Sequence, residues 1–308
     1  MGGSGGGTFS TSSPEELRAK VREAESQSED AAFETALSDS LGALLGSANE
    51  RDVALANERL KHAVELLEED IEGSLDSLFG GSVKKHTYVD GLSDIDSLII
   101  VNNSELLDQN PSKIIGYIAE KLANGAIEGA KISTGSLAVT VDYDDGMSIQ
   151  LLPAIKTSTG LKVPSWTTND WSNINPEKFA TALTKRNQEC AGKLVPTIKL
   201  AKAINATLPE DAQLSGYHIE SLAISAFRSY EGPKTVNKML PHFFDRSKDL
   251  VLSAITDKSG QSVHVDEYLG ADNSEQRKSA SHILSRIHKR MRNATAAHSQ
   301  DQWLALFE

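Results

Sequence analysis

Apolar residues recur at helical spacing through the first quarter of the chain. Ser13, followed by Pro14 and two glutamates, is a typical helix start, because serine caps the first turn, proline fits its first position and acids favour its positive end. A second stripe, at spacings of three and four, predicts a helix that ends near Gly80; its members are Leu60, Val64, Leu67, Ile71, Leu75 and Leu78. We therefore expect two helices before the first strand.

The middle of the chain carries the patterns of strands. Residues 98–101 form the run Leu-Ile-Ile-Val, which predicts a buried strand, and a helical pattern follows over residues 111–123. Residues 137–143 and 147–152 flank the turn sequence Asp-Asp-Gly, in which Asp-Gly is a strong hairpin signal. These patterns predict a mixed sheet that includes an antiparallel hairpin.

After residue 164 the chain becomes helical. Helical patterns cover residues 176–188, 194–205, 215–230 and 274–292. We therefore expect an α/β (α+β) fold in which a mixed sheet core is joined to an α-helical C-terminal lobe. The expected units are a flexible Gly/Ser tail (1–13), the sheet core with the two N-terminal helices (14–165) and the helical lobe (166–308).

Composition and charge narrow the class of protein. The 308 residues are 39% hydrophobic and 24% charged and contain no long apolar run, which excludes disordered and membrane-spanning classes. The formal net charge of −12 has the wrong sign for a broad face that grips long nucleic acid. Residues 14–77 hold 17 of the 43 acids but only 6 of the 31 bases, so we expect the first two helices to form an acidic outer brace. The near-neutral remainder is compatible with a small anionic ligand.

Cysteine and histidine usage excludes two further kinds of site. The single cysteine, Cys190, can form neither an internal disulfide nor a zinc cluster, so we expect a cytoplasmic location and a buried, unreactive thiol. The N-terminus has neither the basic nor the apolar segment of a secretory signal. The histidines show no His-x-His or His-Glu-x-x-His spacing, so a zinc hydrolase is unsupported.

Residues 80–96 carry the densest candidate chemistry. Asp94 and Asp96 stand two apart at the head of the predicted strand, so both carboxylates are expected on one face, where they suit Mg²⁺. Gly81 lets the backbone approach a triphosphate, and Ser82 adds a hydroxyl and a backbone donor. Taken singly, Gly-Gly-Ser is a common loop, and Asp-Ile-Asp fits a strand entrance or a turn cap. In this order they indicate nucleotidyl transfer, in which paired metals activate a hydroxyl and stabilise the leaving pyrophosphate.

The order of these motifs resembles that of the polymerase-β-like nucleotidyltransferases. Within that superfamily the chain resembles the CD-NTases, bacterial cyclic-oligonucleotide synthases related to oligoadenylate synthase and cyclic GMP-AMP synthase. Three further stretches carry the resemblance: the third-carboxylate strand (150–154), the helix whose lysine approaches the triphosphate (197–202) and the Ser-Tyr-x-x-Glu helix start beside the base (214–220). The similarity extends over residues 50–230.

The resemblance implies a Mg²⁺-dependent enzyme with two ions, or Mn²⁺ in their place, that condenses nucleoside triphosphates into a cyclic di- or trinucleotide and releases pyrophosphate. ATP, GTP or another nucleotide would be the substrate, and neither long nucleic acid nor a membrane is an expected partner. A role in a bacterial anti-phage (CBASS) system is implied, with a regulatory protein and a downstream effector activated by the product. Two alternatives stay open, namely nucleotidyl transfer to a protein or small molecule, and a catalytically weak nucleotide-binding module.

The resemblance also assigns roles to residues. The catalytic residues and metal ligands are Asp94, Asp96 and Gln150. The nucleotide-binding residues, with Lys202 on the β- or γ-phosphate, are Gly81, Ser82, Lys199, Lys202, Ser215, Tyr217 and Glu220. Simpler explanations compete with these roles. Lys199 fits a solvated lysine and Tyr217 a core residue. Ser215 and Glu220 fit helix caps.

Gln150 departs from the family pattern, which places an acid at this position. Its amide oxygen can bind a metal but brings no charge and is a poor base. With a two-residue turn in the hairpin, Asp142 would face Ile149 and point away from the side of Gln150; a longer turn changes this. Three readings follow: Gln150 is a neutral ligand, Asp142 or Asp144 substitutes for it, or catalysis is weakened. We favour the first.

A basic stretch near the C-terminus remains outside this scheme. Residues 275–292 contain a single acid and six bases, Arg277, Lys278, Arg286, Lys289, Arg290 and Arg292. Such a stretch is usually a solvated helix face, and it is the best candidate in the chain for an anionic regulator or a partner surface.

Overall fold

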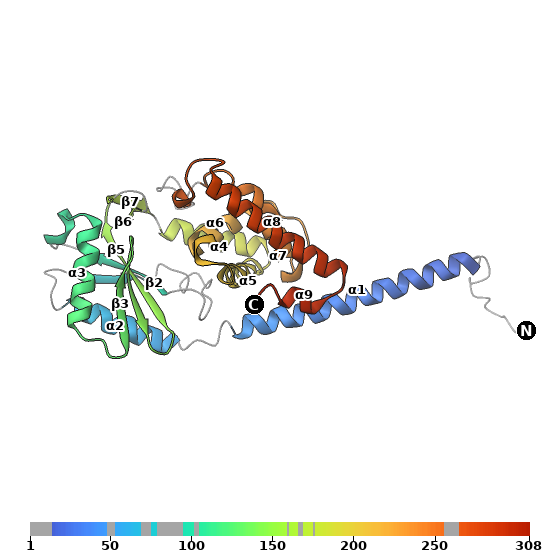
Figure 1. The fold of residues 1–308 in the computed structure, drawn as a ribbon, viewed down its shortest axis with the longest axis horizontal. Helices are drawn as coiled ribbons and strands as arrows, with labels where there is room; N and C mark the ends of the chain where they lie inside the picture. Colours follow the sequence, from blue (N-terminus) through green and yellow to red (C-terminus); the bar gives the residue numbers. More distant parts are fainter. Residues whose placement is uncertain are drawn as a thin grey trace, which may run out of the picture.

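A mixed β-sheet forms one lobe of the molecule (Figure 1). The computed structural model describes residues 14–47, 53–68, 75–78, 95–101, 105–158, 160–165, 169–174, 176–255 and 265–308. Within these residues the strands are β1 Leu75–Leu78, β2 Ile95–Val101, β3 Ala130–Thr134, β4 Val139–Tyr143, β5 Ser148–Lys156, β6 Leu161–Pro164 and β7 Trp171–Ile174. Their order is β1-β2-β5-β4-β3, with β6 paired to β5 and β7 to β6. Since β2 and β5 are parallel and the other described pairs are antiparallel, the expected mixed sheet is confirmed.

The two faces of this sheet differ in character. Alternate residues of the central strands share one core with α2 (Val53–Glu68) and α3 (Pro111–Asn124); they are Ile99, Val101, Val139, Val141, Ile149 and Leu151. The residues between them on β4 and β5 are exposed or half-buried, and they include Thr140, Asp142, Ser148 and Gln150. Strand alternation thus leaves a polar row on the face opposite α2 and α3.

The predicted helix ending near Gly80 is shorter than expected. α2 ends at Glu68, and residues 75–78 form β1 instead of a last helical turn. β1 pairs antiparallel with β2, from Leu75 opposite Val101 to Leu78 opposite Leu98. A spacing of three between two leucines is typical of one face of a helix, but the hydrogen-bonded pairing with the edge of β2 makes this segment a strand.

The β4–β5 turn is longer than the two-residue turn counted from the sequence. Tyr143 N donates to Met147 O at 2.8 Å and Gly146 N donates to Tyr143 O at 2.9 Å, so three residues form the turn. Gly146 has φ +85°, the left-handed conformation that closes such a turn and that glycine adopts at little cost. Arg59 of α2 pairs with Asp145 at 2.9 Å and ties the turn to the sheet lobe.

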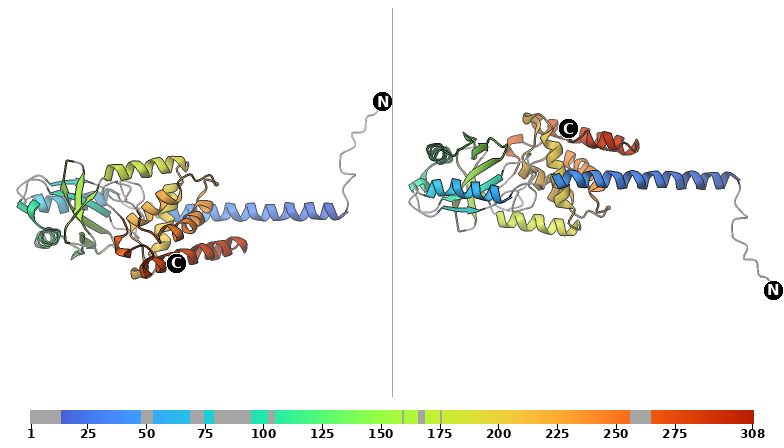
Figure 2. Two further views of the ribbon diagram at one scale, coloured as in Figure 1. Left: turned by 90° about the horizontal axis from the view of Figure 1, so that it is seen from above. Right: turned by 90° about the horizontal axis from the view of Figure 1, so that it is seen from below.

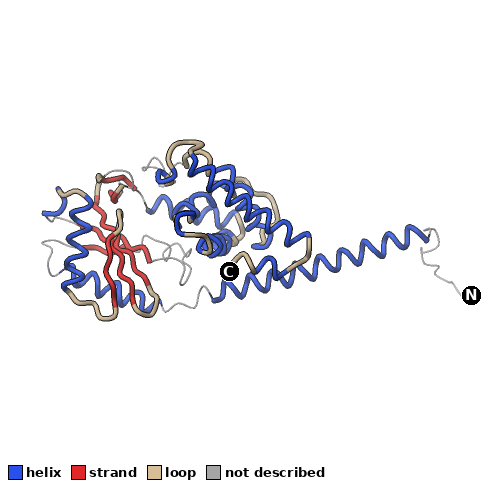
Figure 3. The backbone as a smooth tube through the Cα atoms, viewed as in Figure 1, coloured by secondary structure: helices blue, strands red, loops and turns tan. Residues whose placement is uncertain are grey.

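The second lobe is helical and lies beside the sheet lobe (Figures 1 and 3). Its described helices are α4 Pro176–Glu189, α5 Leu194–Ala206, α6 Gly216–Ala226, α7 Val236–Leu250, α8 Glu275–Ala296 and α9 Gln300–Leu304. α4 and α5 agree with the sequence prediction within one residue, whereas α6 ends earlier and α8 later. The sequence did not predict α7, because Pro241 interrupts its pattern and prolines are rare inside helices.

Cys190 belongs to the core of this lobe. It is 1% exposed, and burial raises the pKa of its thiol. The prediction of a buried cysteine is confirmed, and a raised thiol pKa disfavours the reactive thiolate.

The long helix α1 (Pro14–Ser47) packs on the helical lobe with its C-terminal half. Phe33, Leu37 and Leu41 are buried in the same core as α5, α7 and α9. Its first half extends beyond the body of the molecule (Figures 1 and 2). We expected this helix in the same unit as the sheet, whereas its buried side chains lie in the core of the helical lobe. Among the described residues, no helix is both long and apolar enough to cross a membrane.

Candidate nucleotide and metal site

The parallel strands β2 and β5 bring two predicted metal ligands to neighbouring positions. In the β2–β5 ladder Asp96 is the direct partner of Gln150, and neighbouring strands lie about 4.8 Å apart. Gln150 is half-buried and has Thr140 opposite it on its other side. Asp94, Gly81 and Ser82 lie outside the described residues, so their predicted roles stay predictions.

Asp142 lies on the same face of the sheet as Gln150, contrary to the register counted from the sequence. The three-residue turn pairs Asp142 with Ser148, which is two positions from Gln150 and therefore shares its face. Ser148 Oγ donates to Asp142 Oδ1 at 2.8 Å, and the carboxylate is exposed. Asp142 is nevertheless one strand farther from β2 than Gln150 is. Asp144 lies in the turn itself, beside Gly129.

The helical lobe joins two predicted nucleotide-binding residues in a buried ion pair. Lys202 Nζ on α5 lies 2.9 Å from Glu220 Oε1 on α6, and the side chains are 5% and 1% exposed. Gly216 opens α6 beside this pair, because a Cβ there would lie 3.3 Å from the Lys202 ammonium. A small residue therefore lets the first turn of α6 approach the lysine. Glu220 pairs with Lys202, and the N-cap residue of α6 is Ser215.

Lys199 stands three residues before Lys202 and is half-buried. Burial lowers the pKa of its ammonium, and the positive charge of Lys202 lowers it further. Lys202 is paired with Glu220, and its charge still disfavours the charged form of Lys199, so a phosphate next to Lys199 would favour that form. This arrangement is suited to a phosphate chain.

The start of α6 is held by its own cap. Ser215 is the N-cap residue, and its side chain accepts from His218 N at 3.2 Å, so the expected capping role is confirmed. Tyr217 is half-buried and its ring centroid lies 4.5 Å from that of Phe179 on α4. Tyr217 thus packs against the helical core and is also positioned by it.

Arg277 is buried, contrary to the expectation that the basic stretch 275–292 is a solvated helix face. Its side chain is 1% exposed and lies 2.6 Å from Asp266 Oδ2. The signal was present in the sequence, since the buried stripe of α8 follows helical spacing through Arg277, Ala280, Leu284, Ile287, Met291 and Ala294. The other five bases of the stretch are exposed.

Sequence reasoning also missed Tyr268, which lies next to the start of α6. Its hydroxyl accepts from Ser215 N at 3.1 Å and lies 2.7 Å from His218 Nδ1. Burial lowers the pKa of His218 to about 4, so the ring is neutral near neutral pH. A lone tyrosine in a poorly patterned segment carries no signal that would have identified it.

A mixed sheet with an aspartate on one of two parallel central strands, joined to a helical lobe that presents lysines, is the arrangement of polymerase-β-like nucleotidyltransferases. The family model of the Second Messenger Oligonucleotide or Dinucleotide Synthetase domain matches residues 29–187, just over half of the chain. The chain therefore belongs to this family of nucleotidyltransferases, which synthesise cyclic oligonucleotides, and the expected CD-NTase membership is confirmed.

Solved structures show the same fold at low sequence identity. Escherichia coli MS115-1 CdnC with ATP has a TM-score of 0.65 and 14% identity, covering 83% of this chain and 89% of that one. The same protein in a complex named CdnC:HORMA-deltaN has 0.58 and 13%, covering 82% and 88%. Vibrio cholerae DncV cyclic AMP-GMP synthase, in complex with a linear intermediate, has 0.59 and 10%, covering 94% and 89%. The comparison with curated proteins finds no relative of the chain.

Proposed function

We propose that this chain joins nucleoside triphosphates and closes them into a cyclic di- or trinucleotide, releasing pyrophosphate at each step. The observation that carries the proposal is the pairing of Asp96 with Gln150 on parallel strands, in a chain of this family. A 3′ or 2′ hydroxyl of the acceptor attacks the α-phosphorus of the donor while the bond to pyrophosphate breaks. A second attack within the linear product closes the ring.

Asp94, Asp96 and Gln150 are the residues proposed to hold two Mg²⁺, with Mn²⁺ as the alternative. Carboxylate and amide oxygens are hard ligands of the kind that these ions prefer, so the donor set fits. Bound ions would activate the attacking hydroxyl and offset the charge of the leaving pyrophosphate. Gln150 keeps the ligand position next to Asp96 without adding a third negative charge. Asp142, one strand away and bonded to Ser148, is the less favoured ligand.

The helical lobe is proposed to bind the triphosphate through its lysines. Burial and the charge of Lys202 both lower the pKa of the half-buried Lys199, and a bound phosphate would favour its charged form. Glu220 forms a buried ion pair with Lys202, which favours a positioning role for this carboxylate over contact with a base edge. Ser215 and Tyr217, at the start of α6, are proposed to line the nucleotide side. Gly81 and Ser82 are proposed to contact the donor phosphates.

The biological role is proposed from the relatives. CdnC, which shares the fold, is found in complex with a HORMA protein, and DncV is a cyclic AMP-GMP synthase. We place this chain in a bacterial anti-phage system, acting in the cytoplasm with a regulatory protein and an effector that responds to the cyclic product.

The test is incubation with labelled ATP, GTP, CTP and UTP, separately and mixed, in Mg²⁺ or Mn²⁺, with mass spectrometry of phosphatase-resistant products. Asp94→Ala and Asp96→Ala should each abolish the product, whereas Asp39→Ala, an exposed aspartate of α1, should not. A wild type that makes no such product refutes the proposal. A label that migrates with protein would indicate transfer to a protein acceptor instead.

Gln150 separates an active enzyme from a weak nucleotide-binding module. Under the proposal, the wild type with Gln150 turns over nucleotides, and Gln150→Ala lowers this turnover strongly. Tight nucleotide binding without turnover, with turnover appearing only in Gln150→Asp or Gln150→Glu, would favour the binding module.

A further inference from the structure

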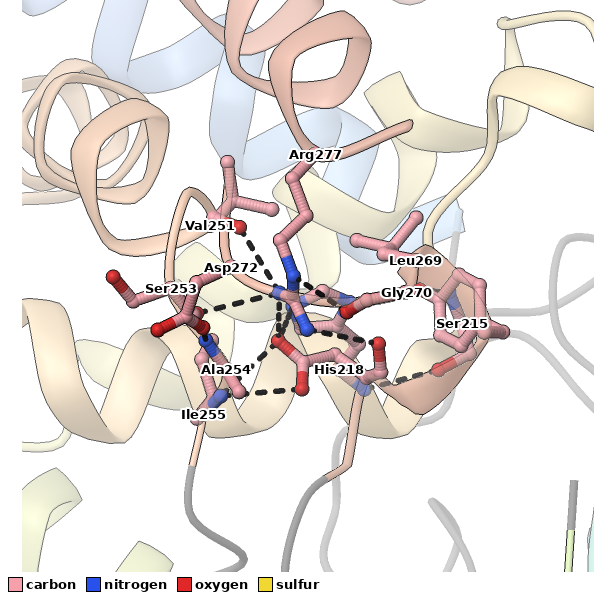
Figure 4. Close-up of polar contacts among 12 residues, drawn as sticks. Ser215, His218, Val251, Ser253, Ala254, Ile255, Leu269, Gly270, Asp272 and Arg277 are labelled. Carbon is pink, nitrogen blue, oxygen red and sulfur yellow. Dashed lines mark hydrogen bonds and ion pairs between the residues drawn. The ribbon is translucent and has the colours of Figure 1, made fainter. Parts of the chain in front are cut away.

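A buried polar cluster lies behind the start of α6 (Figure 4). Its centre is the ion pair between Arg277 of α8 and Asp266, two side chains that are 1% and 0% exposed. A fully desolvated pair of this kind is stable only with good geometry and with its remaining donors and acceptors satisfied. The Arg277–Asp266 pair meets both conditions.

The guanidinium joins two backbone stretches, residues 251–253 and 266–270. Besides Asp266, it donates to the carbonyls of Gly270 at 3.0 Å, Val251 at 3.1 Å and Ser253 at 3.3 Å. Both carboxylate oxygens of Asp266 accept from Ile255 N, at 3.1 and 3.2 Å. Residues 251–255 and 265–270 are therefore held as one unit against α8.

Tyr268 stands in this unit, on the 3₁₀ turn Glu267–Leu269, and it reaches α6. Its hydroxyl accepts from Ser215 N and lies within hydrogen-bond distance of His218 Nδ1. Because the buried His218 is neutral, its Nδ1 can accept a hydrogen bond from the Tyr268 hydroxyl, while the hydroxyl oxygen accepts one from Ser215 N. One hydroxyl thus holds both the cap residue and the first turn of α6.

We propose that Tyr268 is a positioning residue for the nucleotide site, which fixes the first turn of α6 and is itself held by the Asp266–Arg277 pair. The inference rests on the proposed function, because it assumes that Ser215 and Tyr217 line the nucleotide. A shift of this turn would displace both residues together. Tyr268 acts through them and does not touch the nucleotide.

The experiment compares Tyr268→Phe with Tyr230→Phe. The first variant removes the hydroxyl and keeps the ring. The second is a matched control in the same lobe, since the Tyr230 hydroxyl also forms a hydrogen bond with the backbone, donating to the carbonyl of Pro233 at 3.0 Å. For each we would measure the nucleotide concentration at half-saturation, kcat and the melting temperature.

Tyr268→Phe should raise the half-saturating nucleotide concentration about 5–20-fold, with kcat changed less than about 3-fold, because the half-buried Ser215 N–H loses its acceptor and the buried His218 Nδ1 loses its partner. Tyr230→Phe should leave both unchanged. If Tyr268→Phe lowers the melting temperature while half-saturation stays within about 2-fold of wild type, Tyr268 is structural only and the inference is overturned. A wild type without activity would instead overturn the proposed function, and this inference with it.

Discussion

Replacing Lys202 by methionine tests how strongly the buried ion pair joins α5 to α6. Lys202 Nζ lies 2.9 Å from Glu220 Oε1 in a site where both side chains are almost fully buried. Lys202→Met keeps the aliphatic stem and leaves the Glu220 carboxylate buried without its ammonium partner. Breaking a buried pair in this way costs about 3–5 kcal/mol of the free energy of unfolding, which corresponds to a fall of roughly 6–15 °C in melting temperature.

The double variant Lys202→Met/Glu220→Met removes both charges and buries an apolar pair instead. It should recover most of the stability lost by the single variant, because an apolar pair of similar size carries no desolvation penalty. Thermal unfolding followed by fluorescence measures all the variants. The coupling between the two sites is then obtained from the double-mutant cycle.

Lys278→Met is the matched control for this prediction. Lys278 and Glu275 form a pair of nearly the same length, 2.8 Å, but their side chains are 55% and 86% exposed. Solvent screens such a pair, so its loss should not change the melting temperature measurably. The reasoning is refuted if Lys202→Met lowers the melting temperature no more than Lys278→Met does, or if the double variant is as unstable as the sum of its singles.

Three further predictions concern stability. Leu41→Ala, at a 1% exposed site where α1 meets the helical core, should cost about 2–5 kcal/mol in urea unfolding, and the exposed Ser38→Ala next to it should cost nothing measurable. Gly146→Ala should cost about 1 kcal/mol through its positive φ alone, whereas Gly116→Ala within α3 should stabilise by about 0.5–1 kcal/mol; equal effects would contradict the assigned turn. His218 has a pKa of about 4 in the folded chain against 6.5 ordinarily, so its stabilisation is complete above pH 6.5 and is lost as the pH falls towards 4. Between pH 7 and pH 5 the wild type should lose roughly 2 kcal/mol more than His218→Gln, and identical losses would show that His218 does not titrate in this way.

Elements with complete local signals could be predicted from the sequence. α3 begins at Pro111 after Asn110, whose side chain accepts from Lys113 N, and a regular apolar stripe buries its inner face. The predicted span 111–123 differs from Pro111–Asn124 by one residue. Cap, first-turn proline and periodicity all act within a few residues, so no distant contact was needed to define this helix.

Pairing partners could not be predicted in this way. Leu75 and Leu78 fit a helical stripe, and they form β1 because the edge of β2 offers them hydrogen bonds. The face of Asp142 depended on a single residue of turn length, which shifts the register and exchanges the two sides of a strand. Alternation shows which residues share a face of one strand, but the neighbouring strand decides what they meet.

The amino-acid sequence by itself determined the fold class, the order of the motifs and the membership of a nucleotidyltransferase family, since these depend on periodicity and on short spacings. Only the tertiary structure decided that Gln150 is the neighbour of Asp96, that Lys202 is paired with Glu220 and that Arg277 is buried with Asp266. Each of these pairs joins different elements of the fold. The place of Arg277 in the apolar stripe of α8 indicates that it is buried, but the opposite charge that such a side chain meets depends on how the elements pack, and local sequence does not contain that information.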